Sequence, residues 1–237
     1  SFLQGQKQLN VPFTIQALDQ EFECQKVLRL LPRKRLVVEA KSEQQHAVIK
    51  LFAAAEKGHR ELEREHQGYQ LTKEAGAVVP EMLFAGDNQQ GCLMIAYQYI
   101  SNGQTLMQLD EVQRNEQLGV LFDCISKLHA YGIYQDDIHL DNFLLADNQL
   151  YLLDLGSIKK QRPGEGLSER LSLKNLSRLI AQFSFDDRPL LSPHLEQYFR
   201  SRGSGYNNAA QAHLAKVNHK AWQKRKSNYL KKCFRNC

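Results

Sequence analysis

The sequence predicts an α+β protein of two lobes, in which a small antiparallel sheet with one helix precedes a mostly helical lobe. Strand-like runs crowd into the first hundred residues, and helical periodicity dominates the rest. A chain of 237 residues with 42% hydrophobic content is long enough for two small lobes, each with its own core. We assign residues 1–20 to an N-terminal lead-in, 21–98 to the first lobe and 99–237 to the second lobe, which ends in a basic helix.

The first lobe is expected to be a sheet interrupted by one helix. Residues 1–20 are weakly patterned and predict an extended or partly helical lead-in. Runs rich in Val, Ile and Leu over 25–31, 35–40 and 47–52 predict three antiparallel strands. Residues 54–75 then predict a helix. After Gly76 and Pro80, residues 81–85 and 92–99 predict a second hairpin.

The second lobe is expected to be mainly helical from Gln104 onward. Apolar residues recur there at spacings of three and four, which is typical of a buried helix: Leu118, Leu121, Phe122, Ile125 and Leu128. We expect a polar connector over 157–170. Further helices are expected over 172–183, 192–202 and 209–235.

An acidic segment within the second lobe contains the candidate catalytic and metal-binding residues. Asp137 is followed by Asn142, and then by Asp154 in an Asp-Leu-Gly triplet. Apolar runs on both sides of an Asp-Asn turn predict a hairpin that brings Asn142 and Asp154 together, with Asp137 facing them. Phosphoryl transfer needs oxygen ligands for Mg²⁺ and a carboxylate that orients the attacking hydroxyl. The segment therefore predicts Asp154 as main metal ligand, Asn142 as second ligand and Asp137 as base.

This layout resembles the catalytic and metal-binding loops of the protein-kinase-like superfamily, with Leu155 in place of the usual Phe. The resemblance implies a bilobal protein-kinase-like fold that uses ATP and Mg²⁺. It also implies that Lys50 binds the nucleotide phosphates and pairs with a helix glutamate, although strand alternation equally permits an outward-facing lysine. The candidates are Glu61, Glu63 and Glu65. The distance from Glu65 to the next proline resembles that in small bacterial and archaeal kinase-like proteins, so we predict that Glu65 is the partner of Lys50.

The same resemblance makes residues 97–100 the hinge, where the backbones of Gln98 and Tyr99 would hydrogen-bond adenine. The alternative is an ordinary strand with aromatic packing. His139 occupies the place of a catalytic-loop lysine, which implies contact with the γ-phosphate or the substrate; a structural histidine is the alternative. Gln135-Asp136 replaces the usual His-Arg, and there is no Ala-Pro-Glu motif. Both departures argue against a regulated eukaryotic-type protein kinase.

The nucleotide-covering loop departs from the superfamily, because residues 31–35 read Leu-Pro-Arg-Lys-Arg without glycine. Glycine lets backbone amides close on phosphates. Here Arg33, Lys34 or Arg35 would contact phosphate through the side chain, or the segment is an exposed basic turn. The departure keeps open a pseudokinase that acts as a binding scaffold.

At the level of family, the chain resembles the bacterial lipopolysaccharide core kinases, which include Kdo and heptose kinases. The resemblance runs from about Lys26 to the end. Besides the residues above, it rests on four segments: RELERE, LHAYGI, KNLSRLIAQF and YLKKCFRNC. It implies a glycolipid substrate, the lipopolysaccharide core, phosphorylated on a sugar hydroxyl. A small atypical protein kinase is the alternative enzyme.

Charge is distributed unevenly along the chain. Ten basic and no acidic residues follow Glu196, whereas the other 196 residues hold 21 basic and 26 acidic ones. The family implies that this basic end, with Trp222, Tyr229 and Phe234, lies near an anionic membrane surface. The alternative is a helix packed on the larger lobe with its charges in water. No recognised nucleic-acid-binding module is present, so we expect no nucleic-acid partner.

Five cysteines without framework spacing favour a reducing compartment. There is no apolar run near 18 residues, and the first residues lack a signal pattern. We therefore expect a cytoplasmic protein, and the family resemblance places it at the cytoplasmic face of the inner membrane.

Overall fold

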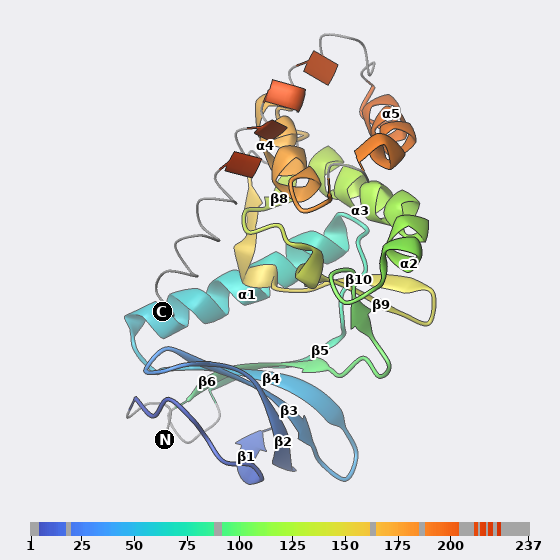
Figure 1. Cartoon of the computed structure of the whole chain (residues 1–237). Coiled ribbons are helices and arrows are strands. Elements are labelled where there is room, and N and C mark those ends of the chain that lie inside the picture. The colour runs from blue at the N-terminus through green and yellow to red at the C-terminus, as the bar shows by residue number, and fades with distance from the viewer. Residues whose placement is uncertain are drawn as a thin grey trace. The chain divides into compact units, whose positions relative to one another are not determined.

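The structure is a computed structural model of the chain (Figure 1). It describes residues 5–17, 20–87, 92–161, 165–184, 188–203, 211, 212, 214–216, 218, 219, 222 and 223. These residues form two compact units. The first comprises described residues within 1–71, 79–102 and 153–157, and the second those within 72–78, 103–152 and 158–237. The α+β class predicted from the sequence, with an antiparallel sheet first and helices afterwards, is confirmed.

The first unit is built on an antiparallel sheet with strand order β1-β2-β3-β4-β6-β5. Its strands are β1 Phe13–Ala17, β2 Gln20–Leu31, β3 Arg35–Lys41, β4 His46–Phe52, β5 Met82–Asp87 and β6 Leu93–Gln98. The three predicted strands and the second hairpin are confirmed as β2, β3, β4 and the β5–β6 pair. Strand β1 was not predicted. It lies in the lead-in and pairs with β2, because Ile15 and Ala17 alternate into the core and hold this edge.

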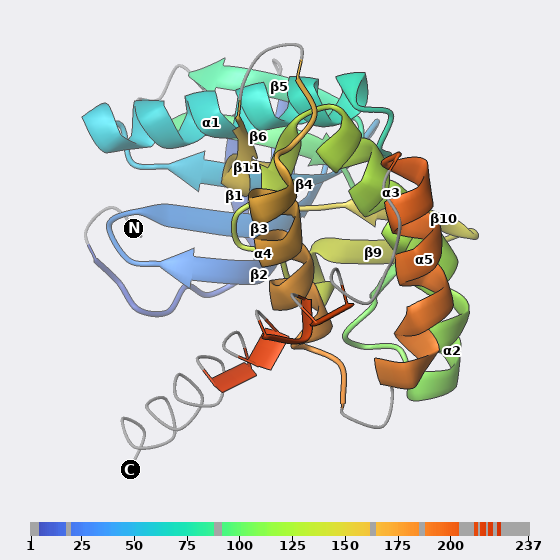
Figure 2. The same ribbon diagram turned by 90° about the horizontal axis from the view of Figure 1, so that it is seen from above.

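The sheet is curled (Figure 1). An apolar core lies on one of its faces. That core consists of Ile15, Ala17, Phe22, Cys24, Leu36, Val38, Ala40, Ala47, Ile49, Leu51, Met94 and Ala96. Helix α1, Glu56–Glu74, confirms the helix expected over 54–75 and lies along the other face (Figure 2). Side chains alternate across a strand, so Lys50, between the core residues Ile49 and Leu51, points toward α1.

The second unit contains three short pairings of strands and a group of helices. Its elements are β7 Gln104–Thr105, α2 Glu111–Glu116, α3 Leu118–Ala130, β8 Ile133–Gln135, β9 Phe143–Ala146, β10 Gln149–Leu152, β11 Ile158–Lys160, α4 Glu169–Ile180 and α5 Ser192–Ser201, with 3-10 turns at Leu140–Asn142 and Arg188–Leu191. The predicted hairpin is present as β9 and β10. Asp147 and Asn148, both at positive φ, form its turn.

Three details of the second unit differ from the sequence prediction. The helix expected from Gln104 starts only at Glu111, because Asp110 caps it by accepting a hydrogen bond from the Gln113 amide. Gln104 and Thr105 pair with β9 instead. The first residues of the expected connector form strand β11, which pairs with β8. Helix α4 starts at Glu169 rather than at residue 172.

Helices α3 and α5 lie side by side (Figures 1 and 2), joined by a hydrogen bond between the hydroxyls of Ser126 and Ser201. Most of the helix expected over 209–235, including Tyr229 and Phe234, lies outside the described residues; Trp222 is helical and half-buried. Among the helices that the described residues form, none has the length and apolarity needed to cross a bilayer.

Candidate active site

Lys50 forms an ion pair with Glu65, with 2.7 Å between Nζ and Oε1. The sheet register places Lys50 beside Val37 on β3 and Ile95 on β6, so its side chain rises between two apolar neighbours toward α1. The Glu65 side chain is 1% exposed and the Lys50 side chain 13%. Of the three glutamates that the sequence offered, Glu65 is the one in contact. Its buried carboxylate holds the ammonium in one position.

Two further groups surround the Glu65 carboxylate. The hydroxyl of Tyr97 donates a hydrogen bond to Oε2 at 3.2 Å, and Arg35 Nη1 lies 4.0 Å from Oε1. Burial, followed by the charge of Glu65, raises the pKa of Tyr97, so this hydroxyl stays protonated and remains a donor. Lys50 Nζ also lies 5.6 Å from the centre of the Tyr97 ring. The sequence reading had assigned Tyr97 only to the hinge.

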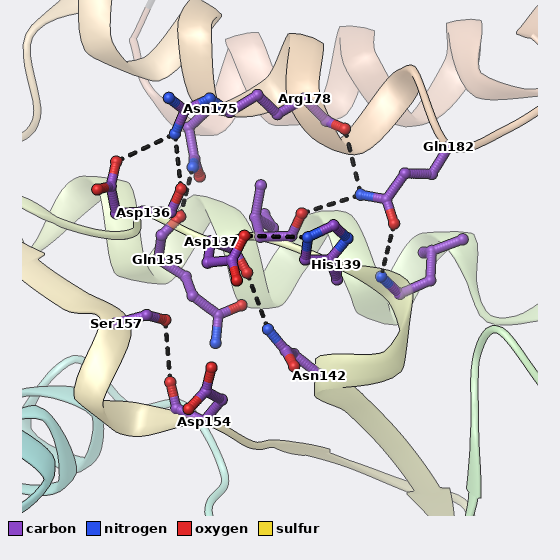
Figure 3. Close-up of polar contacts among 12 residues, drawn as sticks. Gln135, Asp136, Asp137, His139, Asn142, Asp154, Ser157, Asn175, Arg178 and Gln182 are labelled. Atoms are coloured by element: carbon purple, nitrogen blue, oxygen red, sulfur yellow. Dashed lines mark hydrogen bonds and ion pairs between the residues drawn. The ribbon is translucent and has the colours of Figure 1, made fainter. Parts of the chain in front are cut away.

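Asp154 lies on the other side of Lys50, with its Oδ1 4.0 Å from Nζ. Its backbone has φ of 54°, in the left-handed region that aspartate tolerates better than most residues. The carbonyl of Asp154 accepts hydrogen bonds from the amide and hydroxyl of Ser157 (Figure 3). These two hydrogen bonds hold the backbone of the Asp-Leu-Gly turn, which carries the Asp154 side chain.

Gly156, the glycine of this triplet, is required by Glu65. A Cβ on Gly156 would lie 2.9 Å from Glu65 Oε1 and 3.2 Å from Cδ. Close approach of this kind explains the glycine without any special backbone angle. The Asp-Leu-Gly segment therefore packs closely against the Glu65 carboxylate, which holds Lys50.

Replacing Gly156 by alanine is expected to lower the free energy of unfolding by about 1–3 kcal/mol, because the buried Glu65 carboxylate must shift. Chemical denaturation of both proteins measures the change. Gly119→Ala on α3 is the matched control. Its Cβ would meet His194 Cε1 at an ordinary 3.8 Å, so helix propensity should leave that variant at least as stable as the original protein. Equal stabilities of Gly156→Ala and Gly119→Ala would contradict the fit.

The predicted hinge and basic turn are only partly placed for nucleotide contacts. The amides of Gln98 and Tyr99 donate to the carbonyls of Glu81 and His46, so a contact with adenine at either residue would use its carbonyl oxygen. The Tyr99 ring stacks on His46, with 3.8 Å between centroids. In the β2–β3 turn, Arg33 has φ of 60° and is exposed.

Within that turn, the two arginines named for phosphate contact point to different places. Arg35 reaches the Lys50–Glu65 pair, as described above, whereas the Arg33 side chain lies against Gly5. Lys34 is exposed. Of these residues, Arg35 is the one that lies beside the Lys50–Glu65 pair.

In the second unit, Asp137 stands on a loop whose apolar residues anchor it. Ile138 and Leu140 are buried, while Asp137 and His139 are exposed between them. His139 Nε2 lies 3.0 Å from Asp137 Oδ1 (Figure 3). The alternation turns both polar side chains outward. It places an imidazole beside the carboxylate that the sequence predicts as the base.

Asn142 forms a hydrogen bond within the loop that carries Asp137. Its Nδ2 donates a hydrogen bond of 2.9 Å to the carbonyl of Asp137 (Figure 3). Because the amide nitrogen is used in this way, Oδ1 is the atom that Asn142 can offer to a metal ion. Asn142 directly precedes β9, and Asp154 follows β10 by two residues; the strands are paired with Phe143 opposite Leu152.

Asp136, next to the predicted base, is bound by two basic residues. Lys159 Nζ lies 2.7 Å from its Oδ2. Arg178 Nη1 contacts both its Oδ1 at 3.0 Å and its carbonyl oxygen at 2.6 Å (Figure 3). The hydrogen bond from Lys159, followed by that from Arg178, lowers the pKa of the Asp136 carboxyl despite partial burial. Asp136 therefore remains charged and ties β11 and α4 to the loop.

A buried chain of hydrogen bonds also ends on this loop. Asn175 Nδ2 donates to the carbonyl of Gln135 at 2.8 Å, so its Oδ1 must accept from His129 Nε2 at 3.0 Å. His129 Nδ1 then accepts from the hydroxyl of Tyr198 at 2.7 Å. His129, Asn175 and Tyr198 are all buried. The chain thus fixes His129 as a neutral imidazole with its proton on Nε2.

His129 is expected to make the protein sensitive to acid. Burial lowers its pKa to about 3 from an ordinary value of 6.5. Between these values the unfolded chain binds a proton that the folded one does not. The free energy of unfolding should therefore fall as pH drops below 6.5, by up to ~1.4 kcal/mol per pH unit from this residue, and be unaffected above 6.5. Urea denaturation at pH 7, 6 and 5 should show a shallower pH slope for His129→Gln than for the original protein; equal slopes would contradict the assignment.

The donor set suits Mg²⁺ better than a structural transition metal. Among the described residues, no group of three or more His, Cys, Asp or Glu side chains could hold a metal ion. The predicted ligands are one amide oxygen and one carboxylate. Mg²⁺ characteristically keeps several waters and takes one or two protein oxygens together with substrate phosphates. Asn142 and Asp154 fit that pattern.

The contacts of several residues were not predicted from the sequence. These residues are Arg178, Asn175, Gln182, Lys159 and Asp136 around the loop, and Gly156 beside Glu65. One signal was present: Asn175 interrupts the apolar, buried stripe of α4. A polar residue in such a stripe needs a hydrogen-bonding partner, although the sequence does not say which.

Comparison with solved structures shows that the fold is shared. The structure of WaaP in complex with acyl carrier protein matches 84% of this chain and 88% of that chain, with a TM-score of 0.60 and 16% sequence identity. At this sequence identity, the likeness shows a shared fold. No family model matches the chain. No curated protein matches it in sequence either.

Proposed function

We propose that this protein is an ATP- and Mg²⁺-dependent kinase that phosphorylates a sugar hydroxyl, Kdo or heptose, of the lipopolysaccharide inner core. The observation that carries the proposal is the group formed by Lys50, Glu65 and Asp154. A lysine held by a buried glutamate, beside the aspartate of an Asp-Leu-Gly segment, is the arrangement that positions nucleotide phosphates in kinases. Three distant stretches of the sequence come together to build it.

The proposed roles follow from the groups each residue presents. Lys50 neutralises charge on the phosphates and Glu65 keeps it in place. Arg35, whose guanidinium lies 4.0 Å from Glu65, supplies a further positive charge, and Arg33 is a weaker candidate for it. The carbonyls of Gln98 and Tyr99 are the hinge groups proposed to meet adenine.

On the acceptor side, Asp137 orients the sugar hydroxyl and accepts its proton, and the imidazole of His139 lies beside it to contact phosphate or substrate. Asn142 Oδ1 and the Asp154 carboxylate are proposed to hold Mg²⁺, which supplies charge stabilisation on the phosphates when bound. The hairpin supports this, because its register pairs the residue after Asn142 with a residue two before Asp154.

The sugar acceptor is supported by the resemblance in sequence and by the fold shared with WaaP. We propose that the protein works at the cytoplasmic face of the inner membrane, where the basic stretch after Glu196 would meet anionic headgroups. Because WaaP was solved with acyl carrier protein, that protein is a candidate partner here as well. Adding acyl carrier protein to the turnover assay below, and measuring any change in rate or mass of the complex, tests this.

The decisive experiment is ATP turnover with Mg²⁺, with and without deacylated lipopolysaccharide core. Turnover should be stimulated by core, and Asp137→Ala should lower it by about 100-fold or more, because a positioned base contributes roughly that factor. Asp123→Ala, which removes an exposed carboxylate from α3, is the control and should behave like the original protein. Turnover that core does not stimulate would keep the kinase and discard the sugar. Autophosphorylation detected by mass spectrometry would then favour the small atypical protein kinase.

A second candidate function, a pseudokinase that serves as a binding scaffold, is favoured by one observation. The β2–β3 turn has no glycine, its Lys34 is exposed, and its Arg33 side chain lies against Gly5. Thermal melting with and without ATP and Mg²⁺ separates the two candidates. No shift, together with no nucleotide consumption, would make the scaffold the working hypothesis.

A further inference from the structure

The backbone of the loop around Asp137 is held by side chains at every peptide group from Gln135 to Leu140. Asn175 binds the carbonyl of Gln135, and Arg178 binds that of Asp136. Asn142 binds the carbonyl of Asp137. Gln182 holds the next two peptide groups, through the carbonyl of Ile138 and the amide of Leu140. Five consecutive peptide groups are therefore each hydrogen-bonded to a side chain.

Gln182 completes the set just beyond the end of α4. Its Nε2 donates to the carbonyl of Ile138 at 2.9 Å, and its Oε1 accepts from the amide of Leu140 at 2.9 Å (Figure 3). A second bond from Nε2 to the carbonyl of Arg178 fixes the amide itself. Asn175, Arg178 and Gln182 are spaced by three and four residues, so they share one side of the helix and of its continuation.

Arg178 holds the most consequential of these groups. The carbonyl of Asp136 belongs to the peptide plane that joins Asp136 to Asp137, so the guanidinium fixes the rotation that leads into Asp137. The same nitrogen, Nη1, also donates to the Asp136 carboxylate at 3.0 Å, so the contact is charge-assisted. Lys159, from β11, closes the other side of the same carboxylate.

We propose that Arg178 is a positioning residue for Asp137, acting with Asn175 and Gln182 as a clamp that keeps the catalytic carboxylate aligned through contacts built into the fold. Asp136 occupies the position where kinases commonly carry an arginine that engages a phosphorylated loop. In this protein, Asp136 is bound by Arg178 and Lys159. The clamp therefore needs no phosphorylation. The assignment of Asp137 as base rests on the proposed function, whereas the clamp on the loop is a property of the fold.

The test compares Arg178→Met with Lys174→Met, which removes a charge from an exposed position of the same helix. Arg178→Met should lower kcat by about 100-fold and leave KM for ATP within a fewfold, because a misplaced catalytic group costs rate rather than nucleotide binding. Arg178→Lys should recover part of the loss, since an ammonium keeps a positive charge that can pair with Asp136 but lacks the planar guanidinium. Lys174→Met should be close to the original protein. If Arg178→Met proves unstable, Gln182→Met replaces it, because it removes the contacts on the other side of Asp137.

A double-mutant cycle distinguishes positioning from general damage. In an Asp137→Asn background, Arg178→Met should cause no further loss of kcat, because the residue it positions is already disabled. A loss of the same size in both backgrounds would overturn the proposal.

Hydrogen exchange separates failure of this inference from failure of the proposed function. Amides of residues 135–142 should exchange about tenfold faster or more in Arg178→Met than in Lys174→Met, since a charged hydrogen bond to the loop is lost. If the original protein transfers no phosphate to any acceptor, the proposed function fails and exchange alone decides the clamp. Equal exchange in the two variants would overturn it.

Discussion

Asp154→Asn is expected to lower phosphotransfer by roughly a thousandfold while the protein keeps its fold. The substitution removes the negative charge of the proposed main Mg²⁺ ligand and preserves its shape. Asparagine also tolerates the φ of 54° at this position, and the two bonds from Ser157 go to the backbone carbonyl, which the substitution leaves in place. Turnover measured across a range of Mg²⁺ concentrations should show both a lower maximum and a weaker apparent affinity for the metal.

Asp147→Asn is the matched control for that experiment. Asp147 lies in the β9–β10 turn at φ of 48° and is exposed, so the same change of side chain is made at the same kind of backbone position. It should leave the metal dependence unaltered. If Asp154→Asn keeps the original dependence on Mg²⁺, Asp154 is not the ligand and the proposed metal site is wrong.

Lys50→Met is expected to have the largest effect on stability. The Glu65 carboxylate is 1% exposed, and its main partner is the Lys50 ammonium at 2.7 Å. Removing that partner leaves a buried charge held only by the Tyr97 hydroxyl and by Arg35 at 4.0 Å. The free energy of unfolding should fall by about 3 kcal/mol, which is the typical cost of breaking a buried ion pair on one side. Urea denaturation at pH 7 measures it.

Two further variants make this prediction specific. Lys57→Met removes an exposed lysine from the same unit and should change stability by less than about 0.5 kcal/mol. The double variant Lys50→Met with Glu65→Gln should be more stable than Lys50→Met alone, because the buried charge is gone and the Tyr97 hydroxyl keeps an acceptor. A double variant less stable than the single one would show that the pair is not what holds this part of the unit together.

Local sequence patterns were sufficient to predict much of the fold. The alternation of apolar residues in 47–52 and the Asp-Asn turn at 147–148 gave β4 and the β9–β10 hairpin. The helix after β4 was also expected within two residues of its bounds. These elements are decided by neighbours in sequence, through turn geometry and side-chain periodicity, so a sequence is sufficient to predict them.

Contacts that join distant stretches were harder to foresee. Strand β1 depends on pairing with β2, and β11 depends on pairing with β8, although neither segment is strongly strand-like by itself. The β7 strand arises where Gly103 lets Leu144 come close, since a Cβ there would lie 2.8 Å from Leu144 Cδ2. Tertiary pairing overrides weak local preference at such places.

By itself, the sequence determined which residue types are available for phosphoryl transfer and in what order they occur: Lys50, Asp137, Asn142 and Asp154. Tertiary structure decided which partners they have. The packing of α1 against the sheet brought Glu65, the glutamate predicted from the resemblance, to Lys50, and the packing of α4 brought Arg178 to the peptide group before Asp137. The physical reason is that spacing fixes the face of a helix on which a residue lies, whereas only packing of the whole unit fixes what that face meets.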